Sequence, residues 1–182
     1  GLEAATLTCS TSATDNTGNI VCGSGATANT GQSIAIGGSS NAIGDQSVAV
    51  GANTNATGNS SIAIGGDDLD KVASTSPPAY NVNAPNTNNN TAAATKYKTL
   101  TGDDLVNFAD VTKRYVSTQA GNGAVAIGVQ AVATGELGTA FGTKAKALGV
   151  ASVGLGVGAN ASLENAVALG AGATTVTNAT AV

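Results

Sequence analysis

The chain has 182 residues, and its composition excludes several classes of protein. Its formal net charge of −4 argues against nucleic-acid and anionic-membrane binding, which depend on clustered lysine and arginine, and it lacks the apolar run of about 18 residues that a membrane-spanning helix needs. Only 10% of the residues are charged and 3% are aromatic, so a compact globule would gain too little from large side chains, and a thin repetitive fold or one shared between chains is expected.

Residues 1–18 form a leader of mainly small and polar residues, with Cys9 inside it and Cys22 shortly after it. The opening GLEAATLTCS has neither a basic region nor a long apolar run, so we expect that any secretion signal is removed or lies outside this chain. A cysteine pair at this spacing is compatible with a disulfide in an oxidising compartment, which would stabilise the fold by about 3 kcal/mol. Two unpaired small hydrophobic residues are the alternative.

Residues 19–66 repeat a short phrase at a fixed period. SIAIGG begins at Ser33, SVAVGA at Ser47 and SIAIGG again at Ser61, each fourteen residues after the last, and a weaker copy begins at Asn19. The period returns over residues 123–174, in units that begin at 124, 138, 152 and 166. We number the positions of each unit from 1 to 14, with Ser33 at position 1.

Four columns of the repeat carry its structural signal. Position 3 is alanine in the seven copies that begin at Ser33 or later, except for Gly154 in one of them. The larger apolar residues and the glycines are, at position 2, Ile34, Val48, Ile62, Val125, Val153 and Val167; at position 4, Ile36, Val50, Ile64, Ile127, Phe141, Leu155 and Leu169; and at position 5, Gly37, Gly51, Gly65, Gly128, Gly142, Gly156 and Gly170.

These columns predict a stack of two-stranded coils. Branched residues at alternate positions indicate a strand, alanine between them indicates a narrow buried interior, and glycine at position 5 allows a tight turn. The second half of each unit, as in SSNAIGDQ, predicts a shorter strand and a second turn. Coils spaced by about 4.8 Å through parallel backbone hydrogen bonds would give eight units a height of roughly 40 Å.

One apolar face of the longer strand is left over in such a coil. The residues at positions 2 and 4 point away from the interior, and a soluble monomer rarely exposes so large an apolar patch. Copies of the same chain around a rotation axis would cover it, and we expect a homotrimer.

Residues 67–122 interrupt the period and hold all three prolines, all three tyrosines and five of the seven basic residues. The stretch STSPPAYNVNAPNTNNNTAAAT is typical of an exposed loop. After it, Thr101 and Asp104 resemble a capping box, and apolar residues at 105, 108, 111 and 115 recur at helical spacing. The insertion is therefore predicted to be a loop followed by a helix that starts at Thr101.

The insertion also supplies the candidate ligand-binding residues, because binding surfaces use aromatic and basic side chains on adaptable backbone. The alternative for the aromatic residues, including Phe108 and Tyr115, is that they hold the helix on its support, and for the basic residues a solvated surface or an ion pair between chains. The exposed second half of each repeat is a further candidate. The insertion candidates are Tyr80, Lys96, Tyr97, Lys98, Lys113 and Arg114.

No catalytic or metal-binding constellation is expected. The chain has no histidine, which removes the commonest general base and the commonest metal ligand. Asp67, Asp68, Asp103 and Asp104 stand before apolar runs, where capping of helix N-termini is the simpler role, and the GGxGxD repeat of calcium-binding rolls is missing. We therefore predict a protein that is not an enzyme and uses no cofactor.

The repeats resemble those of a known family. QSIAIGGSS (residues 32–40) and QSVAVGANT (46–54) resemble the NSVAIGxxS head repeat of trimeric autotransporter adhesins, the YadA-like family, and NAVALGAGA (165–173) resembles the copies that close such heads. The insertion resembles that of the ubiquitous-surface-protein type of head. The resemblance implies an all-β fold, a left-handed parallel β-roll that is homotrimeric, with residues 175–182 leading toward a neck and stalk.

The resemblance also implies a function. We expect the head of a bacterial cell-surface adhesin, an extracellular passenger anchored in the outer membrane through parts outside this chain. Its partners would be collagen, with which the family's repeats are associated, fibronectin, laminin, host cells or abiotic surfaces, without nucleic acid and without membrane contact in this fragment. A structural spacer that displays a binding domain elsewhere on the fibre is the alternative.

Overall fold

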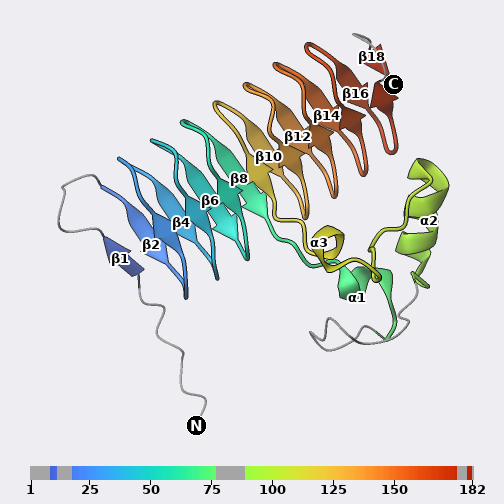
Figure 1. Cartoon of the computed structure of the whole chain (residues 1–182), viewed down its shortest axis with the longest axis horizontal. Helices are drawn as coiled ribbons and strands as arrows, with labels where there is room; N and C mark the ends of the chain where they lie inside the picture. Colours follow the sequence, from blue (N-terminus) through green and yellow to red (C-terminus); the bar gives the residue numbers. More distant parts are fainter. Residues whose placement is uncertain (1–8, 12–17, 77–88, 176–179, 182) are drawn as a thin grey trace.

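The computed structural model of the chain describes residues 9–11, 18–76, 89–175 and 180–181. Its main body is a narrow roll of stacked coils, and a small helical insertion lies along one side of that roll (Figure 1). The described residues contain no helix that is both long and apolar enough to cross a membrane.

Two parallel sheets make up the roll, and each coil gives one strand to each sheet. The first sheet contains β1 (Cys9–Thr11), β2 (Ile20–Cys22), β4 (Ile34–Ile36), β6 (Val48–Gly51), β8 (Ile62–Gly65), β10 (Val125–Ile127), β12 (Thr139–Phe141), β14 (Val153–Leu155), β16 (Val167–Leu169) and β18 (Thr180–Ala181). The second contains β3 (Thr27–Ala28), β5 (Asn41–Ala42), β7 (Asn55–Ala56), β9 (Gln119–Ala120), β11 (Val132–Ala133), β13 (Lys146–Ala147), β15 (Asn160–Ala161) and β17 (Thr174–Thr175).

The strand register confirms the fourteen-residue coil. Ile34 lies beside Val48, and Val48 beside Ile62, so that each residue stacks on its equivalent in the next unit. The shorter strands keep the same register, as in the pairing of Asn41 with Asn55. The predicted parallel β-roll is therefore the observed fold, with β1, which runs antiparallel to β2, as the one exception among the described strands.

Small residues fill the interior of the roll. The alanines at positions 3 and 10, such as Ala35 and Ala42, are fully buried, and so are hydroxyl residues such as Ser61, whose Oγ donates to the Gly58 carbonyl at 2.6 Å. At position 5 of the coils that have another coil stacked after them there is no room for a side chain: a Cβ on Gly37, whose φ is +126°, would overlap the Gly51 carbonyl of the next coil. The narrow interior explains why the sequence repeats alanine and glycine.

The outer face of the first sheet is apolar and partly open. Ile36, Phe141 and Leu155 at position 4 are 38%, 50% and 41% exposed in the single chain. We call the position-4 residues Ile36, Ile64, Phe141, Leu155 and Leu169 the apolar strip. The inner face is buried within one chain as expected, whereas this outer strip stays partly exposed in the single chain.

The insertion interrupts a coil between its two strands. β8 is the first strand of the coil that starts at Ser61, and β9 is its second strand, so the roll resumes at Gln119 and not at residue 123. Between them lie α1 (Asp70–Ala73), α2 (Ala92–Thr101) and α3 (Val111–Arg114), beside the coils that follow the insertion (Figure 1). The long proline-containing part, residues 77–88, lies outside the described residues.

The predicted helix from Thr101 is wrong. Thr101 is the last residue of α2, and Gly102 ends the helix in the left-handed conformation at a φ of +82°. The helix begins instead within the stretch read as a loop, where Thr91 caps it by accepting a hydrogen bond from the Ala94 N–H and three alanines favour helical backbone. Only α3, the short helix at Val111–Arg114, forms within the predicted span.

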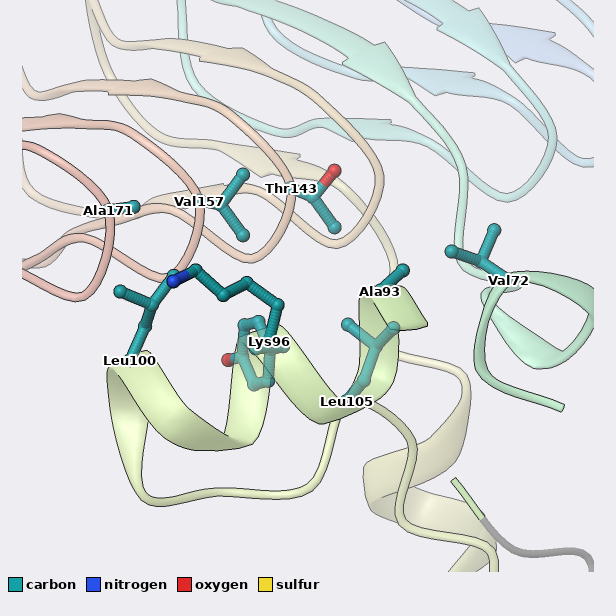
Figure 2. Close-up of a pocket in the computed structure, with 9 residues that line it drawn as sticks. Val72, Ala93, Lys96, Leu100, Leu105, Thr143, Val157 and Ala171 are labelled. Carbon is teal, nitrogen blue, oxygen red and sulfur yellow. The ribbon is translucent and has the colours of Figure 1, made fainter. Parts of the chain in front are cut away.

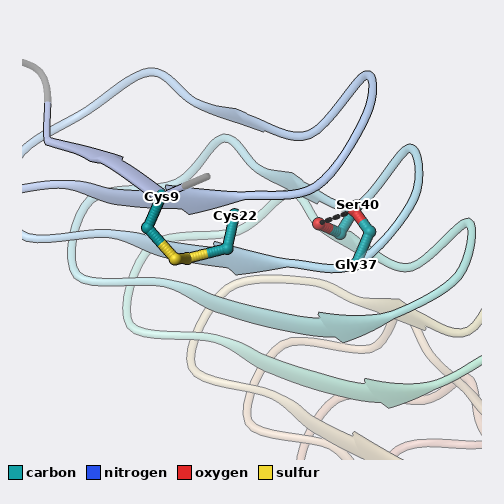
Figure 3. Close-up of a disulfide and its surroundings, with 4 residues drawn as sticks. All are labelled: Cys9, Cys22, Gly37 and Ser40. Atoms are coloured by element: carbon teal, nitrogen blue, oxygen red, sulfur yellow. Dashed lines mark hydrogen bonds between the residues drawn. A yellow bond between two sulfur atoms is a disulfide. The ribbon is translucent and has the colours of Figure 1, made fainter. Parts of the chain in front are cut away.

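A disulfide joins the first two strands of the roll. Cys9 and Cys22 face each other in the register of β1 and β2, with an S–S distance of 2.00 Å (Figure 3). Cys22 stands where Ile36 stands in the next coil, so the disulfide attaches the leader to the outer face of the roll's first coil.

Candidate binding surface

The two ends of the insertion are tied to the roll where they leave it. Thr118 Oγ1 accepts the Gly66 N–H at 3.1 Å and lies 2.8 Å from the Gly128 carbonyl oxygen. Gln130, in the next coil, donates through Nε2 to the carbonyl oxygens of Asp67 at 2.6 Å and Arg114 at 2.7 Å. The insertion therefore starts and ends at a fixed place on the roll.

A buried ion pair links α1 to α3. Arg114 is 2% exposed and donates through Nε to Asp70 Oδ1 at 3.0 Å and through a second nitrogen to Asp70 Oδ2. The Tyr115 hydroxyl donates to Asp70 Oδ2 at 2.9 Å, and the guanidinium lies over the rings of Phe108 and Tyr115. The hydrogen bond to Asp70 raises the pKa of Arg114, while burial and then the Asp70 hydrogen bond raise the pKa of Tyr115 to about 12. This cluster stays charged on Arg114 and neutral on Tyr115 at ordinary pH.

Helix α2 packs on the turns at positions 6 and 7 of the later coils. A Cβ on Gly158 would lie 2.6 Å from Thr101 Cγ2, and one on Gly172 would overlap the Leu100 carbonyl oxygen. Lys144, at the same turn of an earlier coil, donates to the Leu105 carbonyl at 2.8 Å and lies over the Tyr97 ring. Burial, and then the neighbouring Lys146, lower the pKa of Lys144.

A groove of about 290 Å³ remains between α2 and the roll (Figure 2). Its lining is almost wholly apolar, and the charged group in it is Lys96. The lining residues are Ala93, Lys96, Tyr97 and Leu100 on α2; Thr143, Val157 and Ala171 on the roll; and Val72 and Leu105 from the rest of the insertion.

The candidate ligand-binding residues fall into different environments. Lys96 is exposed and lines the groove, beside Tyr97, which is 6% exposed and belongs to the insertion's small core. Lys98 pairs with Asp104 at 2.9 Å and Lys113 with Asp110 at 3.3 Å, both at the surface. Arg114 is enclosed by its buried pair, and Tyr80 lies outside the described residues. The structure thus brings Lys96 and Tyr97 together and separates them from Lys113 and Arg114.

Sequence reasoning missed the apolar part of the groove. Ala93 and Leu100, which were not among the candidates, follow a helical spacing with the candidate Tyr97, but this spacing lay within, or just after, the predicted loop. The roll's wall is a second missed signal, because Thr143, Val157 and Ala171 all occupy position 6 of consecutive units.

The outer face of the second sheet is a separate, polar surface. Thr27 Oγ1 donates to Asn41 Oδ1 at 2.6 Å, and Asn41 Nδ2 donates to Asn55 Oδ1 at 2.9 Å, which forms a ladder of side chains across β3, β5 and β7. A similar contact at the turn before the first-sheet strands joins Gln46 Nε2 to Gln32 Oε1 at 3.1 Å. These flat, regularly spaced polar groups suit an extended partner and not a small substrate.

The acidic residues beside the insertion have local roles. Asp68 Oδ1 accepts the Asp70 N–H at 2.8 Å at the start of α1, and Asp104 pairs with Lys98. Within the part of the chain that the structure describes, no three cysteine or acidic side chains gather as metal ligands would.

Comparison with known proteins finds a family model that matches the repeats. The family model described as the YadA head domain repeat matches residues 42–67, 120–145, 133–153 and 147–173. Among solved structures, the collagen-binding domain of the Yersinia adhesin YadA is similar at 24% identity and a TM-score of 0.46, over 86% of this chain and 69% of that one. None of the curated proteins matches the sequence.

Proposed function

We propose that this chain is the YadA-like head of a trimeric autotransporter adhesin and that the head attaches a bacterial surface to host extracellular matrix, host cells or abiotic surfaces. The observation that carries the proposal is the match of the stacked coils to YadA head repeats on both sides of the insertion. In the related Yersinia protein the corresponding domain is described as collagen-binding. Collagen, fibronectin and laminin are accordingly the first ligands to test.

We propose that three chains form the functional unit, with the apolar strip at their contact. The strip runs along one sheet face, and rotation about an axis parallel to the roll brings three such faces together without leaving an unpaired copy. Three copies of a weak binding surface also give avidity, which attachment to a repetitive matrix needs. The trimer would be carried outside the cell, as the passenger of an anchor that lies beyond this chain.

Two surfaces of the head are candidates for the contact with the ligand. The polar ladder of the second sheet repeats at the coil spacing and suits a long partner, whereas the insertion offers the groove and the exposed Lys96. A deletion separates them. Asp67 and Thr118 occupy positions 7 and 8 of one coil, since Asp67 Oδ2 accepts from Asn53 Nδ2 at 3.0 Å and the Thr118 carbonyl accepts from the Asn55 N–H at 2.8 Å.

The test joins Asp67 directly to Thr118, which restores an uninterrupted coil. The parent and the variant are compared for binding to immobilised collagen, fibronectin, laminin and plastic, with the oligomer mass measured beside each assay. Loss of binding by a variant that keeps its mass assigns the contact to the insertion, and retained binding assigns it to the repeats. If neither protein binds any of these surfaces, the attachment proposal fails.

A structural spacer is the second candidate function. One observation favours it: the charges of Lys98, Lys113 and Arg114 are all compensated within the chain, so fewer basic groups are free for a ligand than the sequence suggested. A spacer would bind none of the immobilised ligands, while a longer fibre that contains it would still attach through another domain.

A further inference from the structure

The groove between α2 and the roll, called the trench below, is short and has two walls of similar length. The α2 wall uses Ala93, Lys96, Tyr97 and Leu100, which at i, i+3, i+4 and i+7 form one stripe about 10 Å long. The opposite wall is made by position-6 residues of three successive coils, and these also span about 10 Å. Two matched walls of this length leave room for one extended chain lying parallel to the roll axis.

Aliphatic side chains that line the groove remain partly exposed to water. Val72, Leu100 and Val157 are 48%, 36% and 40% exposed although each faces the same groove. An apolar occupant would remove this surface from water, and at about 290 Å³ the groove lies near the lower end of the size of small-molecule sites.

The charged amine of Lys96 lies at one end of the trench. Figure 2 shows the amine of Lys96 directed toward Leu100 and Ala171, with Val72 at the other end. None of the ion pairs among the described residues involves Lys96. A second amine, that of Lys144, lies over the Tyr97 ring and donates to the Leu105 carbonyl. None of the ion pairs among the described residues involves Lys144 either.

We propose that this groove binds an unbranched alkyl chain ending in a carboxylate, a medium-chain fatty acid, with the chain along the trench and the carboxylate at Lys96. A peptide is the less suitable occupant, because its backbone groups would enter a lining that offers few hydrogen-bonding partners and would stay unsatisfied. An alkyl chain needs no such partners, and its carboxylate meets an amine that no other described side chain neutralises. This inference does not depend on the attachment that we propose for the head, whichever surface makes that contact.

The test is a titration of the whole chain, in its native oligomer, with hexanoate, octanoate and decanoate below their micelle concentrations. Calorimetry gives the affinity, and methyl NMR shifts at Val72, Leu100 and Val157 locate the ligand. We expect saturable binding that tightens by about fourfold per added methylene until the chain outgrows the trench. Octanol and octylammonium of the same length should bind more weakly than octanoate.

Three variants check the assignment. Lys96→Gln should weaken octanoate binding about two- to fivefold, whereas Lys98→Gln, on the same helix but paired with Asp104 outside the groove, should leave it unchanged. Ala171→Leu adds bulk at an exposed wall position and should abolish binding while α2 keeps its helical circular dichroism. The proposal is overturned if octanoate does not bind saturably or if octylammonium binds as tightly as octanoate. It is also overturned if Lys96→Gln and Lys98→Gln bind octanoate with the same affinity, or if Ala171→Leu binds it as tightly as the parent.

Discussion

At the scale of single residues, the buried pair of Asp70 and Arg114 decides whether the insertion keeps its shape. Removing one partner of a buried pair leaves the other charge uncompensated, which costs about 3–5 kcal/mol, whereas replacing both with apolar groups can cost little. We therefore predict that Asp70→Asn releases α1 and α3, while Asp70→Asn combined with Arg114→Met restores much of the loss. Amide hydrogen exchange across the insertion measures the effect separately from the stability of the roll.

The surface pair of Lys98 and Asp104 is the matched control for this prediction. Both of its side chains are at least half exposed, so Asp104→Asn should cost no more than about 1 kcal/mol. Equal exchange rates in the Asp70→Asn and Asp104→Asn proteins would mean that the buried pair does not hold the insertion together.

At the scale of elements, the docking of α2 depends on two glycines whose backbone conformation does not require glycine. Gly158 and Gly172 have φ near +70°, but Ser39, Asn53 and Gln130 adopt a positive φ at the same position of other coils. The close approach of α2 is the reason for glycine here, because a side chain would meet Leu100 or Thr101. We predict that Gly172→Asn, a residue that this turn accepts elsewhere, costs about 1–3 kcal/mol and loosens α2.

Gly25 provides the control for the helix. It has the same position and a φ of +71°, and the contact nearest to an added Cβ is the Ser39 side chain at 3.2 Å, with no helix above it. Gly25→Asn should therefore leave the exchange of the α2 amides unchanged. If Gly172→Asn also leaves it unchanged, the close packing of α2 on the last coils is not what holds the helix.

The coils could be predicted because their signal is repeated, whereas the helix prediction rested on a signal that occurs once. The strand and turn signals recur in eight units, and a one-residue shift would turn every alanine outward, so the register follows from the pattern. The helix signal at Thr101 and Asp104 occurs once, and Gly102 between them overrides it. The groove and the Asp70–Arg114 pair join residues from distant parts of the chain, 44 residues apart for the pair, and no local pattern encodes such contacts.

At the scale of the whole molecule, the insertion and the apolar strip lie on different surfaces of the roll. Helix α2 occupies the position-6 and position-7 turns, so that edge carries an added element, while the outer face of the first sheet stays open along the roll. Leu155 on the apolar strip and Val157 in the groove lie two residues apart and are 41% and 40% exposed. The same substitution at each position therefore makes a matched comparison of the two surfaces.

We predict that Leu155→Asp converts the trimer to single chains of 17.3 kDa, because three carboxylates would be brought together in an apolar contact at the axis. Val157→Asp adds the same charge outside that contact and should keep the mass of three chains. Light scattering across a dilution series measures both. A trimer that survives Leu155→Asp, or one that dissociates equally with Val157→Asp, would place the contact between chains somewhere other than the apolar strip. We expect dissociation by Leu155→Asp because the roll's interior is already filled by alanine, so the larger aliphatic residues can be buried only from outside.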